Sequence, residues 1–248
     1  RAHTHREQAS TMLLAALLAS AAARTPLHDA ALVGNVAAAE AALDEGASLK
    51  AVSEDGHVPL HDATLRGRRD VVSLLLQRGA DIGAETWDGV TALHLAAAGG
   101  HSSVIDLLLE AGANIEVPGT RHGDTPLHRA VGSGNIDVVS LLLKRGATLA
   151  PDKCESLLHT HHAQHNIARA TFVKLQPLTA ARSALRRYGY TPLHTAAASG
   201  NVEVAELLLR HGAKLTDVNE EGKTALDVAR RHGHLSAMQD VLSSKDEL

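Results

Sequence analysis

The residues best suited to chemistry lie in one short stretch, HTHHAQH, which runs from His159 to His165. His161 and His165 are four positions apart, so on a helix they would share one face, and Cys154 is near them in sequence. Imidazole and thiolate groups are ligands that zinc prefers. The stretch is therefore a candidate metal site, although histidine tracts of this kind are also common as plain surface segments.

Other groupings that could support catalysis do not add up to a site. Neighbours such as His61 and Asp62 resemble an acid–base pair, but no nucleophile recurs at a fixed spacing from them. Cys154 and His159 could form a thiol dyad, yet no third group is evident. The sequence contains no phosphate-binding loop and no zinc-protease motif. We therefore expect no enzyme activity, no bound metal and no cofactor, with a metal-binding or enzymatic protein centred on the histidine stretch as the alternative.

The tetrapeptide Thr-Pro-Leu-His, or a close variant, starts at positions 25, 58, 91, 125, 191 and 224, in steps of 33, 33, 34, 66 and 33 residues. Single glycines and a Gly-Ala pair recur in the same register, and a triple leucine precedes most of these pairs. A fixed period of this length indicates a repeat architecture. The double step indicates a hidden, degenerate repeat near position 156, where SLLH replaces the tetrapeptide.

Each recurring residue has a local role in a predicted pair of short helices. Threonine is a good N-cap, and proline suits the first helical position because its missing N–H would be unpaired there. We expect the tetrapeptide histidine, as in His28 or His194, to bond to nearby backbone. Glycine ends the first helix in a left-handed conformation, and the Gly-Ala pair ends the second. The residues that remain predict a turn or hairpin leading to the next repeat.

Helices this short are marginal alone in water, where about 12–15 residues are usually needed. Their Leu and Ala faces must be buried by the neighbouring repeat, so stacking is predicted to stabilise the whole chain. The composition agrees with this prediction, because the chain has only one Trp, two Tyr and one Phe in 248 residues. A core without rings must be built from aliphatic side chains on many small helices.

The pattern G-x-TPLH-x-AA-x-x-G…LLL-x-x-GA resembles the ankyrin repeat, from residue 25 to about residue 240. The resemblance implies an all-α fold with short β-hairpin loops, an α-solenoid of stacked helix–turn–helix units. We expect residues 1–24 to form an N-terminal segment or capping helix and residues 25–248 to form the repeat domain. Repeats would start near 25, 58, 91, 125 and 191, with the degenerate one near 156, still as two helices, and a partial one at 224.

The resemblance also implies a scaffold or adaptor that binds another protein, either by itself or as the recognition module of a larger protein. In such stacks the partner meets the hairpin tips and the exposed side of each first helix. Three of the four aromatic residues fall at tips, and Trp, Tyr and Arg are enriched at interface hot spots. Alternatively, each ring packs on its own hairpin. The candidate partner-binding residues are His57, Arg66, Trp87, Asp88, Val90, Arg121, His122, Asp124, Ser133, Arg187, Tyr188, Tyr190, Ser199, Glu221 and Lys223.

Charge and hydropathy exclude some classes of partner. The formal net charge of −4 argues against general nucleic-acid binding, which depends on Lys and Arg. Nothing approaches the roughly 20 apolar residues that cross a bilayer. Residues 156–202 contain no Asp or Glu, which is typical either of a docking patch for an acidic partner or of a solvated segment. We expect a monomer that binds a protein.

The two ends bear on the compartment. The apolar stretch from Met12 to Ala23 is either a helix that caps the first repeat or the apolar core of a secretory signal. The chain ends in Lys-Asp-Glu-Leu at positions 245–248, the tetrapeptide that retrieves proteins to the endoplasmic reticulum. The resemblance to ankyrin repeats implies a cytoplasmic or nuclear protein, and the two ends leave the lumen of the endoplasmic reticulum as the alternative.

Overall fold

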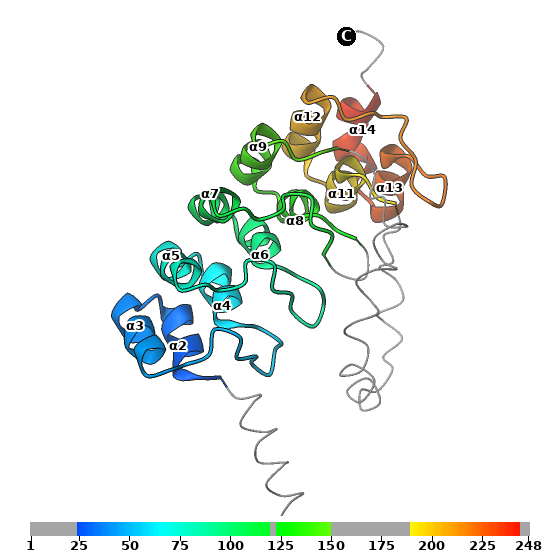
Figure 1. Cartoon of the computed structure of the whole chain (residues 1–248). Coiled ribbons are helices and arrows are strands. Elements are labelled where there is room, and N and C mark those ends of the chain that lie inside the picture. Colours follow the sequence, from blue (N-terminus) through cyan, green and yellow to red (C-terminus); the bar gives the residue numbers. More distant parts are fainter. Residues whose placement is uncertain (1–23, 120–122, 150–188, 244–248) are drawn as a thin grey trace, which may run out of the picture. The chain divides into compact units, whose positions relative to one another are not determined.

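The computed structural model describes residues 24–119, 123–149 and 189–243 (Figure 1). Within these ranges the chain forms helices and turns, with one isolated β-bridge between Gly119 and Asp124 and no strand. The chain divides into two compact halves, residues 1–115 and 116–248. The predicted all-α class of stacked helix pairs is confirmed.

The first helix of each described repeat begins as the tetrapeptide predicts, and all but one end directly at the glycine; the exception, Pro59–Leu65, is capped by Arg66. The backbone N–H of Thr191 donates to Nδ1 of His194 at 3.2 Å, and the N–H of His194 donates to Oγ1 of Thr191 at 3.4 Å. Pro192 occupies the first turn, where its missing N–H leaves nothing unpaired. The helix ends at Gly200 with φ of 72°, a left-handed conformation that disfavours side chains. Residues close to each end in the sequence therefore determine where the helix begins and where it ends.

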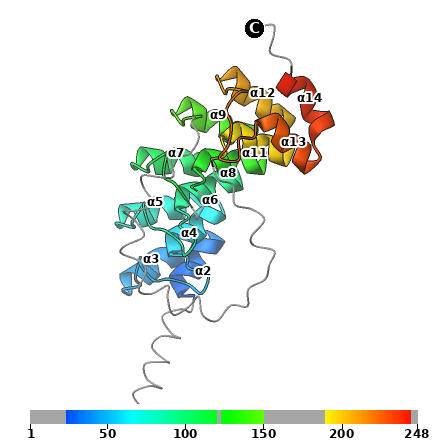
Figure 2. The same ribbon diagram turned by 90° about the vertical axis from the view of Figure 1, so that its right-hand side faces the viewer.

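The N-terminal half contains three helix pairs in its described residues. These are α2 (Pro26–Val33) with α3 (Val36–Asp44), α4 (Pro59–Leu65) with α5 (Arg69–Gln77), and α6 (Ala92–Gly99) with α7 (Ser102–Glu110). The first helices α2, α4 and α6 form one row, the second helices α3, α5 and α7 form another, and each helix contacts the next in its row (Figures 1 and 2). Aliphatic side chains fill the space between the rows, among them Leu27, Leu60, Leu75, Leu93 and Ile105.

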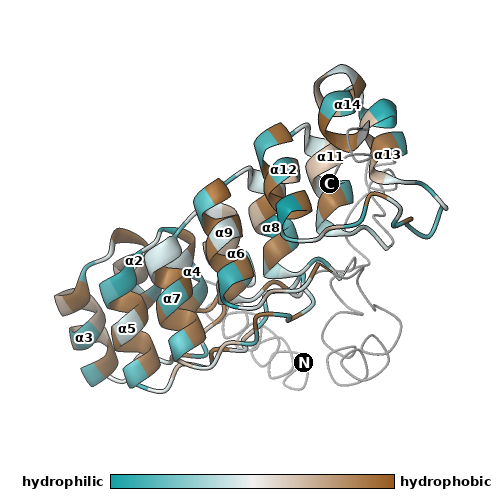
Figure 3. Cartoon of the chain, turned by 90° about the horizontal axis from the view of Figure 1, so that it is seen from above, coloured by the Kyte–Doolittle hydropathy of each residue, from teal (hydrophilic) through white to brown (hydrophobic). Residues whose placement is uncertain are grey.

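The C-terminal half also contains three described helix pairs. These are α8 (Pro126–Ser133) with α9 (Ile136–Lys144), α11 (Pro192–Ser199) with α12 (Val202–Arg210), and α13 (Ala225–His232) with α14 (Leu235–Ser243). Figure 3 shows apolar and polar bands on the helices of both halves, as expected for helices that bury one side. The largest buried side chains here are Leu127, Leu142, Leu193, Leu208 and Met238.

Helices α8 and α11 contact each other directly, although 58 residues separate Ser133 from Pro192 in sequence. Nε2 of His128 lies 2.9 Å from the carbonyl oxygen of Tyr190, and Nδ2 of Asn201 donates to the carbonyl oxygen of Val131 at 3.0 Å. These contacts match those between successive repeats of the N-terminal half. The degenerate repeat expected near residue 156 lies outside the described residues, while the repeats on either side of it are neighbours.

The final repeat, expected as a partial one from residue 224, contains both helices. Helices α13 and α14 have 8 and 9 residues, the same lengths as most of the other pairs. Asp227 replaces histidine in the cap, and its Oδ2 accepts from both the backbone N–H and the hydroxyl of Thr224, at 3.1 and 2.9 Å. A carboxylate suffices here, because within the described residues no later repeat follows for an imidazole to reach.

No helix in the described ranges combines the length and the apolar character needed to cross a membrane. The two terminal segments on which the choice of compartment rests, residues 12–23 and 245–248, lie outside the described residues.

Candidate partner-binding surface

Three of the hairpin tips, residues 53–57, 86–90 and 219–223, are tight turns closed by a backbone hydrogen bond. In the first, the N–H of Ser53 donates to the carbonyl oxygen of His57 at 2.8 Å. In the second, Thr86 donates to Val90 in the same way at 2.9 Å, and in the last Asn219 donates to Lys223 at 3.0 Å. Because each turn closes on itself, the side chains at its apex are presented on a defined backbone rather than on a loose loop.

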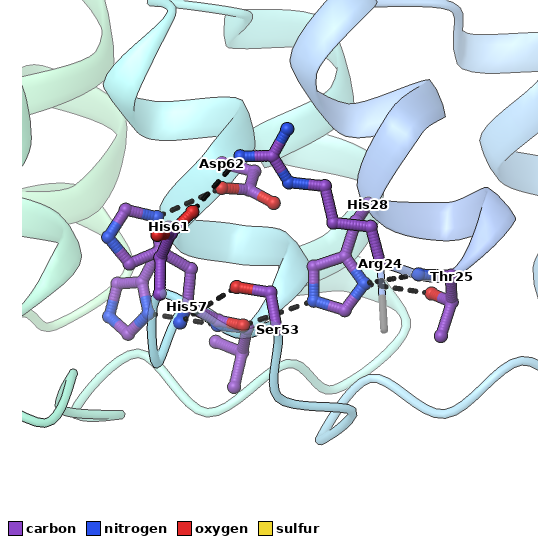
Figure 4. A network of polar contacts seen from close by, with 9 residues as sticks. Arg24, Thr25, His28, Ser53, His57, His61 and Asp62 are labelled. Atoms are coloured by element: carbon purple, nitrogen blue, oxygen red, sulfur yellow. Dashed lines mark hydrogen bonds and ion pairs between the residues drawn. The ribbon is translucent and has the colours of Figure 1, made fainter. Parts of the chain in front are cut away.

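Three of the tetrapeptide histidines join their helix cap to the residue just before the next tetrapeptide. The backbone N–H of Thr25 donates to Nδ1 of His28 at 3.2 Å, so Nδ1 is the acceptor and Nε2 carries the proton. Nε2 of His28 then donates to the carbonyl oxygen of His57 at 3.1 Å (Figure 4). Corresponding bonds join the Nε2 atoms of His128 and His194 to the carbonyl oxygens of Tyr190 and Lys223, at 2.9 Å each. Nε2 of His61 binds the carbonyl oxygen of Ala84 instead, ahead of the second tip, at 2.9 Å. The expectation that these histidines bind backbone is confirmed.

Burial lowers the pKa of two of these imidazoles, those of His61 and His194. It lowers the pKa of His61 to about 4, against an opposing effect of the hydrogen bond to the Ala84 carbonyl, and nearby His57 lowers the pKa further. Burial likewise lowers the pKa of His194, although its bond to the carbonyl of Lys223 acts in the other direction. A neutral ring with one donor and one acceptor nitrogen is the form that the two bonds require.

The imidazole of His57, a predicted partner-binding residue, is fixed by a contact with Asp62. Its Nδ1 lies 3.0 Å from Oδ1 of Asp62, whose side chain is buried (Figure 4). The imidazole of His57 is 18% exposed, so part of the ring faces solvent while the other part is fixed. The pair that resembled an acid–base pair in the sequence, His61 and Asp62, is used differently, because the carboxylate binds His57 and the imidazole binds Ala84.

Trp87 lies at the apex of the second tip and is 45% exposed. A methyl group placed on Gly56 would be 2.6 Å from Cγ of Trp87, so the indole ring lies against the backbone of the preceding tip. For Trp87, the ring thus lies on the neighbouring tip. Asp88 beside it is exposed, and Val90 is half-buried. An aromatic ring supported on one face and open on the other suits an interface hot spot.

The C-terminal ends of the first helices supply the second part of the predicted surface. In the N-terminal half, Arg66 is exposed, Leu65 is 39% exposed and Val33 is 69% exposed. In the C-terminal half, Ser133 and Ser199 are exposed, and their hydroxyls donate to the helix carbonyls of Ala130 and Thr195. The two serines therefore present little free hydrogen-bonding capacity, whereas the ends of α2 and α4 present aliphatic and cationic groups.

Tyr190 is the clearest correction among the predicted contact residues. It is 8% exposed, its ring lies 5.4 Å from the imidazole of His194, and its carbonyl accepts from His128. It precedes the helix cap directly, and its side chain turns inward between repeats. Asp124 is half-buried, and its Oδ2 lies 3.9 Å from Nε of Arg129.

The last tip presents charges. Glu221 and Lys223 are exposed, and Glu221 pairs with Arg231 at 3.0 Å. Beside them is a shallow hollow lined mainly by charged side chains, those of Glu221, Lys223, Asp227, Arg230 and Arg231. Hydrogen bonds from the backbone N–H and from the hydroxyl of Thr224 lower the pKa of Asp227, so this carboxylate is charged under ordinary conditions. Val218, 51% exposed at the same tip, is an apolar residue that sequence reasoning missed, because no aromatic or charge marks it.

Several predicted residues lie outside the described ranges. These are Arg121, His122, Arg187 and Tyr188, together with Cys154 and the histidine stretch from His159 to His165. In the ranges that the structure does describe, no three His, Cys, Asp or Glu side chains are grouped in a way that could hold a metal ion.

Comparison with known proteins follows the repeat pattern. A family model described as ankyrin repeats (3 copies) matches residues 7–86, 83–153 and 152–247. A putative ankyrin repeat protein of Rickettsia bellii (strain RML369-C) is 40% identical over 65 residues, which is 26% of this chain and 39% of that protein. Ankyrin repeat and SOCS box protein 11 of Danio rerio is 58% identical over 38 residues, 15% of this chain and 13% of that protein.

A longer relative shows the same similarity. The homolog of transient receptor potential cation channel subfamily A member 1 from Caenorhabditis elegans is 42% identical over 52 residues, 21% of this chain and 4% of that protein. The chain thus spans between 4% and 39% of the lengths of these three relatives.

Proposed function

Because this chain belongs to the ankyrin repeat family, we propose that it binds a protein partner, as a scaffold or adaptor, through its tips and the ends of its first helices. Ankyrin repeats generally mediate protein–protein interaction and are typically not enzymes. The proposal applies to one copy of the chain, by itself or as the recognition module of a larger protein.

The observation that carries the proposal is the position of Trp87. Trp87 is 45% exposed, so it leaves apolar surface in contact with water, yet it is placed at the apex of a hydrogen-bonded turn. The ring is also supported by the Gly56 backbone, so little side-chain freedom would be lost when a partner covers it. Exposed Leu65 and Arg66 extend the same mixture of apolar and cationic groups to the end of α4.

The structure supports a rigid mode of recognition. The tips close on their own backbone, and the first and last are also bound to buried histidines, so a partner would meet a preformed surface. Preformed surfaces lose less conformational entropy on binding than loops that must order. The tips differ in side chains while their backbone bonds repeat, which is how one scaffold can recognise one partner specifically.

Proximity labelling with variants tests the proposal. The chain is compared with Trp87→Ser, Arg66→Glu and a matched control, Gln77→Glu, which changes an exposed residue at the end of the second helix α5. We expect Trp87→Ser and Arg66→Glu to lose one or more proteins that the wild-type chain and Gln77→Glu both label. Identical labelling by all four chains, with helical content unchanged, would refute the assignment of the surface.

A further inference from the structure

The buried carboxylate of Asp62 is only half satisfied. Its side chain is 1% exposed, and Oδ1 lies 3.0 Å from Nδ1 of His57 in the first tip (Figure 4). Its other oxygen, Oδ2, is also buried and has no hydrogen-bond partner among the described residues. A buried polar atom is costly unless it is hydrogen-bonded, so this oxygen calls for an explanation. The fold does not require a carboxylate at this place, because Leu95 occupies the equivalent position on α6.

The surface residue bound to this carboxylate is His57. Its imidazole is 18% exposed, so the contact lies close to solvent. Nδ1 is the ring atom that meets Oδ1, and the two nitrogens of an imidazole point in different directions, so the ring fits one carboxylate oxygen at a time. A guanidinium group carries parallel N–H donors that bind both oxygens of a carboxylate together. An arginine side chain would therefore satisfy Asp62 more fully than His57 does.

Exposed acids accompany this site. Figure 1 shows the loops that carry the first two tips projecting on the side of the first helices. The exposed carboxylates of these tips, of the residue before the second tip and of α2 are Glu54, Asp55, Asp88, Glu85 and Asp29. Asp55 already holds a guanidinium, that of Arg24 at 3.1 Å, with both side chains exposed. Such exposed pairs contribute little to stability, so a cation from a partner can replace Arg24 at small cost. Together these acids attract a basic segment and speed its encounter with the tips.

The second tip adds an aromatic ring to these charges. Trp87 is 45% exposed and lies against Gly56 of the first tip, so the ring and the acids belong to one continuous surface. Cationic side chains favour the face of an indole ring, arginine most often. Arg66 does not oppose such a ligand, because it lies at the far end of the seven-residue helix α4, about 10 Å along its axis from the cap. The chemistry of these two tips therefore suits arginine side chains.

We propose, resting on the proposed function, that the partner presents a basic segment to the first two tips and that one of its arginines takes the place of His57 on Asp62. The imidazole rotates out toward solvent, and the backbone of the tip keeps its hydrogen bond from Ser53 to His57. The guanidinium then donates to Oδ1 and Oδ2 together. Other cations of the segment pair with the exposed carboxylates of the tips.

Binding of labelled peptides to the full chain tests the proposal. One short peptide alternates Arg with Ala, a second alternates Lys with Ala, and fluorescence anisotropy gives the affinity of each. Asp62→Leu introduces the residue found at this place on α6, so the fold should be kept. Glu40→Gln is the matched control, because it removes one exposed carboxylate from the second helix α3. Circular dichroism checks that each variant keeps its helical content.

The expected affinities differ in sign between the two members of the buried pair. We expect the arginine peptide to bind the wild type and Glu40→Gln equally, and Asp62→Leu about tenfold more weakly. The lysine peptide should bind the wild type more weakly, and Asp62→Leu should change its affinity less. His57→Ala removes the imidazole that competes for the carboxylate, so it should bind the arginine peptide about threefold more tightly.

Three results would overturn the proposal. Equal weakening by Glu40→Gln and Asp62→Leu would reduce it to a general attraction of cations to an acidic chain. Weaker binding to His57→Ala would show that the imidazole is not displaced. Binding that appears only after residues 155–187 are deleted would make the chain's own basic stretch the occupant.

The same variant separates this proposal from the proposed function. In proximity labelling, loss of proteins with Trp87→Ser but not with Asp62→Leu would leave the partner-binding surface in place and refute the arginine contact. Unchanged labelling with both variants would refute both.

Discussion

Nε2 of His128 donates to the carbonyl oxygen of Tyr190 across 2.9 Å, although the two residues are 62 positions apart. The equivalent bonds from His28 to His57 and from His194 to Lys223 span 29 positions each. The difference of 33 residues is one repeat length. The junction between α8 and α11 thus has the contacts of an ordinary pair of successive repeats, with one additional repeat length of chain in its connection.

Removing one repeat length from this connection should leave the junction intact. Deleting Glu155 to Arg187 restores between Gly146 and Thr191 the spacing that is found from Gly79 to Thr91. Urea unfolding should change by about 1 kcal/mol or less, because no described stacking contact is removed. Deleting the equally long stretch from Thr191 to Lys223, which contains α11 and α12, should cost several times more. A large loss in the first deletion would show that the removed residues contribute to the stack.

Stability should fall with acidity in the range set by the buried histidines. The pKa of His61 is about 4 in the folded chain and 6.5 in the unfolded one, so between these values the unfolded state binds more protons. Neutral His61 contributes fully to the free energy of unfolding above pH 6.5. This contribution, about 3 kcal/mol at most, is lost as the pH falls toward 4. Chemical denaturation at several pH values measures this slope. His61→Asn should flatten it, whereas His211→Gln, at an exposed position, should not.

Contact between the two tips of the N-terminal half predicts different costs for two similar glycine substitutions. Gly56 and Gly79 have φ of 79° and 88°, so alanine at either costs about 1–2 kcal/mol in backbone strain. A methyl group on Gly56 would also meet Trp87 at 2.6 Å, whereas nothing lies within 4 Å of one on Gly79. Gly56→Ala should therefore cost about 1–3 kcal/mol more, and it should shift the fluorescence of the only tryptophan.

A double-mutant cycle checks the origin of this difference. In the background of Trp87→Ser, Gly56→Ala should cost no more than Gly79→Ala. If the excess cost persisted without the indole ring, contact between the two tips would not explain it.

The repeat register, the caps and the stacked helix pairs could all be predicted, because each depends on residues a few positions apart. Threonine, proline and histidine at Thr191, Pro192 and His194 specify a helix start whatever surrounds them. Hydrophobic spacing then leaves few ways to bury the leucines. These features could be predicted because the same local interactions recur at a fixed spacing along the sequence.

The placement of single tip residues could not be predicted from local chemistry. Tyr190 and Trp87 both precede a tetrapeptide, yet one ring packs on His194 between repeats and the other lies over Gly56 at the surface. The direct contact of α8 with α11 was equally hidden, because adding a whole repeat length preserves the register on both sides. Such outcomes depend on which repeat becomes the neighbour, and that is a tertiary property.

The most direct test of recognition through the tips is a hydrogen-exchange footprint of the chain with a partner captured by proximity labelling. We predict slower exchange in peptides that contain residues 53–57, 86–90 and the end of α4 at Leu65, with α3, α5 and α7 unchanged. Protection confined to these second helices, with the tips exchanging as in the free chain, would contradict the account.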